Sequence, residues 1–202
     1  MSHPGRGALP KAPRKRAPEL VYQLHVSLEE LRPLIWRRLW VPDTLTLVKL
    51  DRVIQTAMGW TNSHLHEFEI DGARYTMLPD EYDDIDPPGL PERGWRIGDL
   101  LLDHVERFTH LYDFGDGWKH EVVIEARLEP DEEHNTWPLC LAGANACPAE
   151  DVGGVGGYME FLHAMRDPRH EEHRAMWRWA AGPFDPRGFD VNAVNRALAR
   201  LR

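Results

Sequence analysis

Apolar residues recur at every second position in several stretches of the chain, which is the period of a half-buried β-strand. The clearest case is Tyr22, Leu24, Val26 and Leu28, which alternate with more polar neighbours. Hairpin turns are expected at Asp71-Gly72 and at 115–117, because glycine beside aspartate accommodates the backbone of a tight turn. Strands are predicted in this way at 20–28, 35–41, 64–71, 74–78, 106–114 and 118–128.

Helical spacing replaces this alternation after the second strand. Leu47, Leu50, Ile54 and Met58 share one helical face, and together they predict a helix over 46–58. Thr44 or Thr46 can cap its start and Gly59 its end. Further helices are predicted at 96–102, 158–166, 171–180 and 190–201, while 79–95 and 130–157 are expected to be a long loop and an irregular segment.

The order of elements defines a fold class. Two strands, a helix and two strands are followed by another hairpin and then by helices. This order predicts an α+β fold with a mixed or mostly antiparallel sheet and packed helices, some of them C-terminal. Residues 1–18 are rich in proline and poor in large apolar side chains, so we expect a disordered basic tail followed by a single domain at 19–202.

Composition narrows the class of protein further. Hydrophobic residues make up 42% of the 202 residues, enough to bury a core. The sequence has no apolar run of membrane-spanning length and no recognisable secretory signal, so a cytoplasmic location without membrane contact is expected. With only two cysteines and no export signal, a structural disulfide is the less favoured use of Cys140 and Cys147.

Charge is distributed unevenly between the tail and the remainder. The tail has five basic residues and no acid, so it carries +5, whereas the whole chain carries −9 and the remainder therefore −14. A surface with that excess of acid repels phosphate backbones. Nucleic-acid binding is therefore suggested only for the tail, and a protein partner or a small ligand remains open for the folded part.

Histidines occupy inward positions of the predicted strands. His64 and His66 share the parity of Phe68, His110 lies between Phe108 and Tyr112, and His120 shares the parity of Trp118. Side chains two residues apart point to the same face of a strand. A buried imidazole needs a hydrogen-bond partner or a metal ion, so each of these histidines is a candidate for either role.

Anionic and thiol groups near these histidines extend the candidate site. Asp113 and Asp116 flank Gly115 at the turn before His120, and Cys140 and Cys147 lie in a glycine-rich stretch followed by Glu150 and Asp151. Such ligands suit zinc or another divalent ion. The spacing of the two cysteines is not that of a common zinc knuckle. The predicted metal ligands are His64, His66, Asp113, Asp116, His120, Cys140 and Cys147, with Glu67, Trp118 and Asp151 lining the pocket.

Serine chemistry is excluded by the few serines present. Ser2 lies in the tail, Ser27 in a strand, and Ser63 beside His64, whose side chain would point to the opposite face. No nucleophile elbow occurs in the sequence. The glycines at 153–157 match neither a dinucleotide fingerprint nor a Walker loop and favour a flexible entry to a helix.

Several motifs together resemble the plasmid Ri ORF-three-like family. The resemblance covers about 19–195 and follows the family order. Its motifs are Ile35–Arg38, Ala57–Phe68, Tyr112–Glu121, Cys140–Gly154 and Phe184–Asp190. Ala149 stands where proline is expected in the family. The resemblance implies a fold and the location of a site, because these motifs contain the same histidine, aspartate and cysteine positions.

The same family is also described as an insertion-element passenger of the TnpR type, which would imply a DNA resolvase. A serine resolvase needs a nucleophilic serine and an arginine cluster around the scissile phosphate. The folded part offers neither, since its early serine is Ser27 in a strand and its charge is −14. The label is therefore not taken as an activity.

The sequence thus favours a binding or accessory domain associated with mobile elements or bacterial regulation. Our hypothesis is that this domain binds a metal ion. A metal-dependent hydrolase is the alternative, with Glu67 or Asp116 as general base in the same pocket. A third hypothesis is an accessory protein of DNA transactions that acts through the tail.

Overall fold

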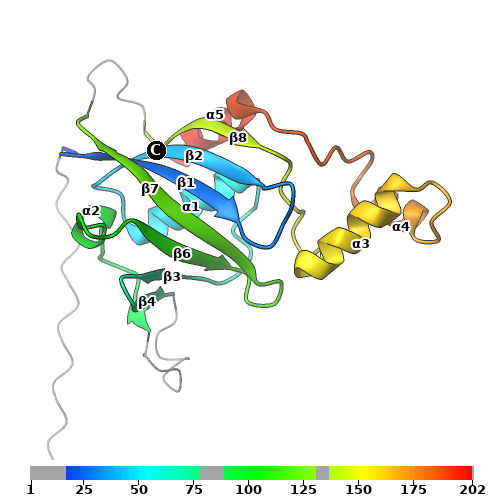
Figure 1. Ribbon diagram of the computed structural model, residues 1–202, viewed down its shortest axis with the longest axis horizontal. Helices are drawn as coiled ribbons and strands as arrows, with labels where there is room; N and C mark the ends of the chain where they lie inside the picture. The colour runs from blue at the N-terminus through cyan, green and yellow to red at the C-terminus, as the bar shows by residue number, and fades with distance from the viewer. Residues whose placement is uncertain (1–16, 78–88, 131–136, 202) are drawn as a thin grey trace, which may run out of the picture.

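The computed structural model describes residues 17–77, 89–130 and 137–201 (Figure 1). These residues form an eight-stranded sheet in the order β5-β4-β3-β6-β7-β1-β2-β8. The strands are β1 (Val21–Leu28), β2 (Trp36–Pro42), β3 (His66–Ile70), β4 (Ala73–Thr76), β5 (Leu90–Pro91), β6 (Arg107–Tyr112), β7 (Trp118–Leu128) and β8 (Leu139–Ala144). The helices are α1 (Leu47–Met58), α2 (Ile97–Leu100), α3 (Gly154–Arg166), α4 (His173–Trp179) and α5 (Val191–Leu198).

The sheet is almost wholly antiparallel. Strand β1 lies between β2 and β7, and β6 joins this central part to the β3–β4 hairpin. The two-residue β5 adds the parallel pairing, beside β4. Registers in this sheet place His66 opposite Tyr112 and His110 opposite His120, so the inward histidines of three strands lie side by side.

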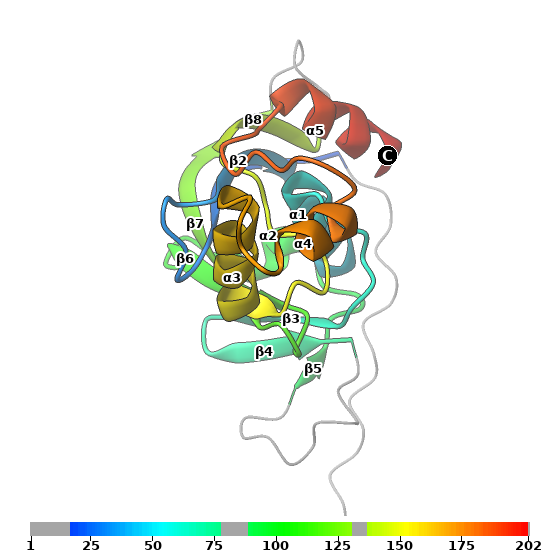
Figure 2. The same ribbon diagram turned by 90° about the vertical axis from the view of Figure 1, so that its right-hand side faces the viewer.

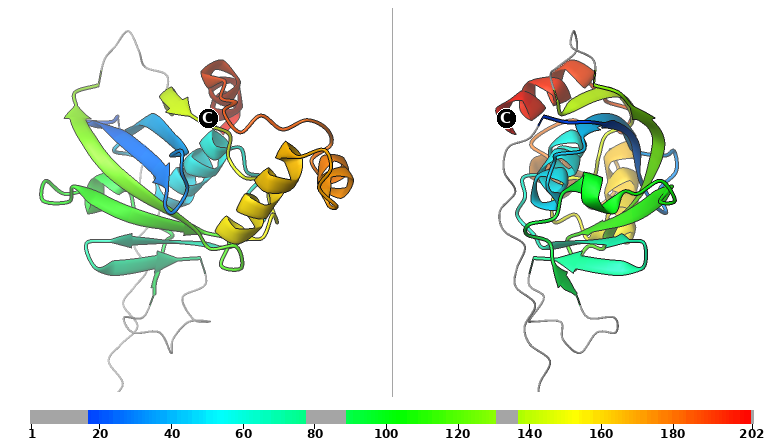
Figure 3. Two further views of the ribbon diagram at one scale, coloured as in Figure 1. Left: turned by 45° about the vertical axis from the view of Figure 1, so that its right-hand side comes forward. Right: turned by 90° about the vertical axis from the view of Figure 1, so that its left-hand side faces the viewer.

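Helix α1 supplies the cover for the inward face. Its N-cap is Thr46, whose hydroxyl accepts the Lys49 amide, and Gly59 ends it in a left-handed conformation. Threonine and glycine are favoured at these two ends because they satisfy or relax the terminal backbone groups. Figure 3 shows the sheet curving around α1. The apolar face predicted from Leu47 and Leu50 is fully buried against it.

The later helices extend the molecule beyond the sheet. Helices α3 and α4 lie past one end of the strands (Figures 1 and 2), whereas α5 lies against β8. Asn195 of α5 accepts the Cys140 amide and donates to the Cys140 carbonyl. This side chain therefore satisfies the backbone groups of Cys140 at the edge strand, where they would otherwise be open.

The structure confirms the α+β class, the mostly antiparallel sheet and the C-terminal helices. Each predicted strand and helix appears, with ends shifted by a few residues. The loop predicted at 79–95 is described only from 89 onward, where β5 forms. Sixteen residues of the expected tail at 1–18 lie outside the described residues.

Two expectations for the C-terminal half were wrong. The segment 130–157 is not irregular throughout, because Leu139–Ala144 forms β8 and pairs with β2. Its residues include no β-branched or aromatic side chain and show no polar–apolar alternation. The strand is held instead by pairing with β2 and by the Asn195 side chain. Helix α3 also begins at Gly154, four residues before the predicted start at 158.

Candidate functional site

A network of buried polar side chains fills the space between α1 and the sheet. Asp51 of α1 is 1% exposed, and its Oδ1 lies 2.9 Å from His110 Nε2 and 3.3 Å from His66 Nδ1. The second contact lacks hydrogen-bond geometry. His66 Nε2 lies 2.8 Å from Glu92, and His110 Nδ1 lies 3.3 Å from His120 Nδ1. The Asp51 carboxylate thus joins α1 to β3 and β6, and His110 extends the network to His120 of β7.

These contacts define the protonation of the network. Asp51 Oδ1 can only accept, so His110 Nε2 carries a proton, and the His110 carbonyl 3.1 Å from His120 Nδ1 assigns a proton there too. Burial lowers the pKa of both His110 and His120, the latter well below its ordinary value. Burial is the largest single influence on Asp51 and opposes its ionisation, but the hydrogen bonds from His110 and Gln55 and the charges of His110 and His66 together lower its pKa.

Stability is therefore expected to decrease as the pH falls. The unfolded chain binds protons at its histidines below pH ~6.5, whereas folded His110 and His120 resist protonation. Each of these two histidines contributes up to ~1.4 kcal/mol per pH unit to the decrease in the free energy of unfolding. Urea unfolding between pH 8 and pH 5 measures this slope. The His104→Ala variant, which alters an exposed histidine, should keep it, and a flat wild-type profile would contradict the assignment.

A second cluster, half exposed, lies where β3 begins and β6 ends. Nε2 of His64 is 3.2 Å from Asp151 Oδ1, 3.6 Å from Asp113 Oδ2 and 3.8 Å from Glu150 Oε2. This nitrogen has no hydrogen-bond partner among the described residues. His64, Asp113 and Asp151 each offer one ligand atom within 4.8 Å of the others. We refer to these residues with Glu150 as the His64 cluster.

Aromatic residues hold the acidic loop of this cluster against the sheet. Trp60 stacks on Tyr112 with ring centroids 4.9 Å apart and donates its indole N–H to the Pro148 carbonyl. The Tyr112 hydroxyl donates to Glu150, which also accepts the Thr61 amide. Burial, and then Glu150, raise the pKa of Tyr112, which therefore remains a donor. Glu150 is thus fixed beside His64 by two elements.

The turn between β6 and β7 positions Asp113. Its Oδ1 accepts the amides of Gly115 and Asp116, so Oδ2 faces His64. Asp116 lies outside the His64 cluster, since its carboxylate accepts the Gly153 amide. Aspartate is one of the few residues that tolerate a left-handed backbone, and both Asp113 and Asp151 adopt it, with φ of +58°.

The two cysteines lie near another group, the buried Arg37. Its guanidinium donates to the carbonyls of Ala57, Trp36 and Ala144 and lies over the Phe189 ring. Both thiols are free. Burial raises the pKa of Cys140 to about 11 and also raises that of Cys147. Neither cysteine belongs to the His64 cluster, and the charge of the buried Arg37 beside both thiols disfavours a metal cation there.

The remaining predicted residues are distributed around the two groups. His66 and His120 belong to the buried network, whereas Glu67 pairs with Arg74 at 2.6 Å. Trp118 is 1% exposed and packs near Trp60. The structure therefore brings together His64, Asp113 and Asp151 from the predicted set and separates the other members.

Sequence reasoning missed the acids of the buried network. Asp51 lies four residues after Leu47 and three before Ile54, so helical periodicity places it on the apolar face, and this signal was available. Gln55 follows one turn later and donates to Asp51 at 2.7 Å. Glu92 lies in a segment without periodicity, and only the fold brings it to His66.

Comparison with known proteins identifies the family. The family model described as plasmid pRiA4b ORF-3-like protein matches residues 20–193. The chain belongs to this family, as its motifs suggested. The described residues contain no helix long and apolar enough to cross a membrane.

Two relatives are similar over most of their length. The uncharacterized protein y4hQ of Sinorhizobium fredii is 36% identical over an alignment of 193 positions, and this alignment covers 90% of this chain and 92% of that protein. The crystal structure of a protein of unknown function, MM3350 from Methanosarcina mazei Go1, has 34% identity and a TM-score of 0.80. That alignment covers 89% of this chain and 98% of the other, which supports the architecture described above.

Proposed function

We propose that this protein is a divalent-cation-binding domain and that His64, Asp113 and Asp151 are the ligands. The observation that carries the proposal is the convergence of three carboxylates on one imidazole nitrogen without a hydrogen-bond partner among the described residues. Asp113 and Glu150 come from separate elements, and each is oriented by backbone amides.

Charge supports a cation at this position. Three ionised carboxylates within 4 Å of one nitrogen repel one another. Within the described part of the chain, no lysine or arginine forms an ion pair with them. His64 could supply one positive charge at most. A divalent ion would offset this excess, as bound cations do in other acidic sites.

The chemistry of the ligands limits which divalent ion the site would bind. One imidazole with carboxylates suits zinc, manganese or iron(II) better than calcium, which prefers oxygen ligands alone. Two ligands of an ion at ~2.1 Å can be at most ~4.2 Å apart. The distances from His64 to Asp151 and Asp113, 3.2 and 3.6 Å, meet this limit, and the ligand atoms of all three residues lie within 4.8 Å of one another.

A metal-dependent hydrolase is the second candidate. The side chain of Asp151 is 73% exposed, so one side of the His64 cluster is open to water and substrate, as a catalytic metal requires. Glu150 lies 3.8 Å from His64 Nε2 and would be the candidate to accept a proton from a bound water. It already accepts hydrogen bonds from Tyr112 and Thr61, and the bases considered from sequence, Glu67 and Asp116, are engaged by Arg74 and Gly153. Because each candidate base is engaged, binding is favoured over hydrolysis.

Elemental analysis tests the proposal on protein purified without an affinity tag or chelator. We expect about one divalent ion per chain, lost in His64→Ala and Asp113→Asn. Mutation of even an outer-shell partner lowers metal affinity about 10–100-fold, so removal of a ligand should lower the affinity further. The matched control is His104→Ala, which removes an exposed histidine 3.1 Å from Asp71. Equal metal content in wild type and His64→Ala would exclude the site.

The biological setting rests on the family. Its description names a plasmid, and we infer an association with mobile elements on that ground. The basic tail at 1–18, which would carry any action on DNA, lies largely outside the described residues. Deleting it and finding unchanged, salt-insensitive DNA binding would exclude such a role for the tail.

A further inference from the structure

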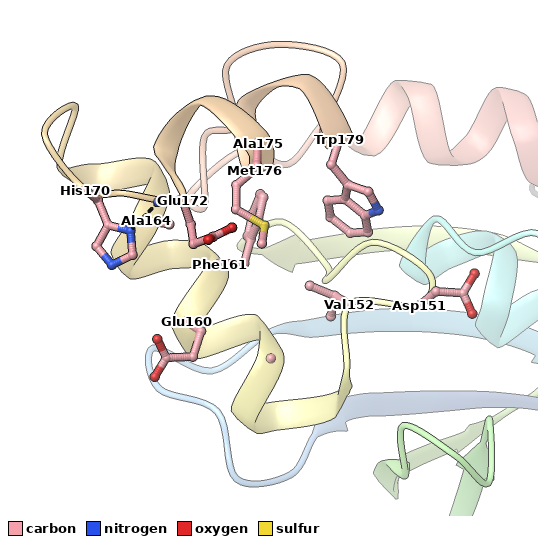
Figure 4. Close-up of a pocket in the computed structure, with 11 residues that line it drawn as sticks. Asp151, Val152, Glu160, Phe161, Ala164, His170, Glu172, Ala175, Met176 and Trp179 are labelled. Atoms are coloured by element: carbon pink, nitrogen blue, oxygen red, sulfur yellow. Dashed lines mark hydrogen bonds between the residues drawn. The ribbon is translucent and has the colours of Figure 1, made fainter.

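Helix α3 separates two pockets of opposite charge. One, of about 490 Å³, lies between α3 and α4 and has Glu160, Glu172 and Asp151 in its lining (Figure 4). The other, of about 530 Å³, lies between α3, the β1–β2 loop and the segment that follows α4. Figure 2 shows α3 with α4 on one side and the β1–β2 loop on the other. We call the second one the arginine pocket.

The arginine pocket has an apolar interior. Its deepest residues, Ile35, Leu31 and Tyr158, are 2–3% exposed and belong to the core. Its wall along α3 is aliphatic, and Met159 on that wall is 52% exposed. The other apolar side chains of the lining are Pro33, Leu162, Met165, Phe184 and Pro186. This volume and lining match those of pockets that bury small apolar ligands.

Three exposed arginines surround this interior, namely Arg32, Arg166 and Arg187, and no acid is part of the lining. None of their guanidinium groups forms an ion pair within the described ranges. The acids next to them in sequence are engaged elsewhere: Asp167 with Arg169, and Asp185 with a backbone amide. Arg32 donates to the Leu31 carbonyl, which leaves its positive charge uncompensated. Arginines without an acidic partner around an apolar pocket are unexpected in a part of the chain that carries −14.

We propose that the arginine pocket binds a single-chain anionic amphiphile, an aliphatic carboxylate with its chain in the pocket and its head on the arginines. Arginine binds carboxylates through paired N–H donors. Burial of the chain in the apolar interior adds a hydrophobic contribution that grows with each methylene group. The pocket on the other side of α3 would repel the same head because of its three acids.

This inference is independent of the metal site. None of the residues that line the arginine pocket belongs to the His64 cluster. Loss of metal binding would therefore leave amphiphile binding unchanged, and the reverse also holds. The two proposals can fail separately.

Calorimetric titration with dodecanoate below its micelle concentration tests the proposal on the full chain. We expect saturable binding at one site, weakened at least tenfold in the double variant Arg166→Gln/Arg187→Gln and by raised salt. Both arginines are exposed, so the fold should tolerate the change. The control Arg169→Gln removes an arginine that is 91% exposed and outside the pocket, and it should bind as wild type does.

Two further tests change the charge of the head group and compare monomeric amphiphile with a lipid membrane. Dodecyltrimethylammonium has the same chain with the opposite charge and should not compete with dodecanoate. Competition by this cation, or equal dodecanoate affinity in the double variant, would contradict the pocket. Binding to vesicles of anionic phospholipid without binding to monomeric dodecanoate would also contradict it, because a membrane surface would then be the partner. A Leu162→Glu variant, which puts an acid in the wall, should abolish binding.

Discussion

Replacing Asp51 by alanine is expected to lower the free energy of unfolding by about 2–6 kcal/mol, because the buried donors of His110 and Gln55 lose their acceptor at a cost of about 1–3 kcal/mol each. Asp51 Oδ1 is the acceptor for His110 and Gln55 and faces His66. Its removal leaves buried donors without an acceptor in a region that water does not reach, and each such group is costly. Urea unfolding with an unchanged m-value measures the loss.

Two further variants separate this effect from a general loss of packing. Asp51→Asn keeps the volume and one acceptor oxygen, so the loss should be about 1.5–3 kcal/mol, that of one charged hydrogen bond. Arg52→Ala changes the next, exposed residue of α1 and should remain within ~0.5 kcal/mol of wild type. A loss below about 1 kcal/mol for Asp51→Ala would show that the network does not stabilise the fold.

The Gly157→Ala substitution is expected to have the second largest effect. A Cβ at this position would lie 1.9 Å from the Val152 carbonyl oxygen, and no rotamer change can relieve a clash with backbone. Overpacking costs about 1–3 kcal/mol and occasionally more, and we expect the upper end. The loop must also move away from α3. Since Asp151 precedes Val152, metal affinity should fall together with stability.

The neighbouring glycine provides a matched control. A Cβ on Gly156 meets no atom within 4 Å, and alanine in a helix is about 0.5–1 kcal/mol more favourable than glycine. Gly156→Ala should therefore stabilise the protein and leave metal binding intact. Thermal unfolding of both variants, with and without added MnCl₂, tests these opposite expected effects on stability. Equal melting temperatures would exclude the close contact between α3 and the loop.

Much of the fold could be predicted because strand periodicity and helix capping depend only on residues close together in the sequence. The period of two placed His66, His110 and His120 on inward faces, and all three are buried. Thr46 and Gly59 marked the ends of α1 through capping chemistry. Such signals depend only on neighbouring residues, so they can be read without knowledge of the tertiary structure.

Features that depend on distant parts of the chain could not be predicted. Strand β8 has no alternation; it pairs with the edge that β2 offers, and Asn195 satisfies the backbone groups of its Cys140. Glu92 meets His66 only through the fold. The sequence analysis also grouped histidines and thiols in one site. In the structure the two cysteines lie near the buried Arg37, which donates to backbone carbonyls, whereas His64 faces carboxylates.

Anomalous diffraction from crystals soaked in MnCl₂ tests the central claim most directly, because it locates the ion as well as detecting it. The proposed site predicts one strong peak within about 2.0–2.3 Å of His64 Nε2, Asp113 Oδ2 and Asp151 Oδ1. The peak should be missing from His64→Ala crystals. A peak elsewhere, or none at an ion concentration that stabilises the protein in solution, would contradict the assignment of the His64 cluster as a metal site.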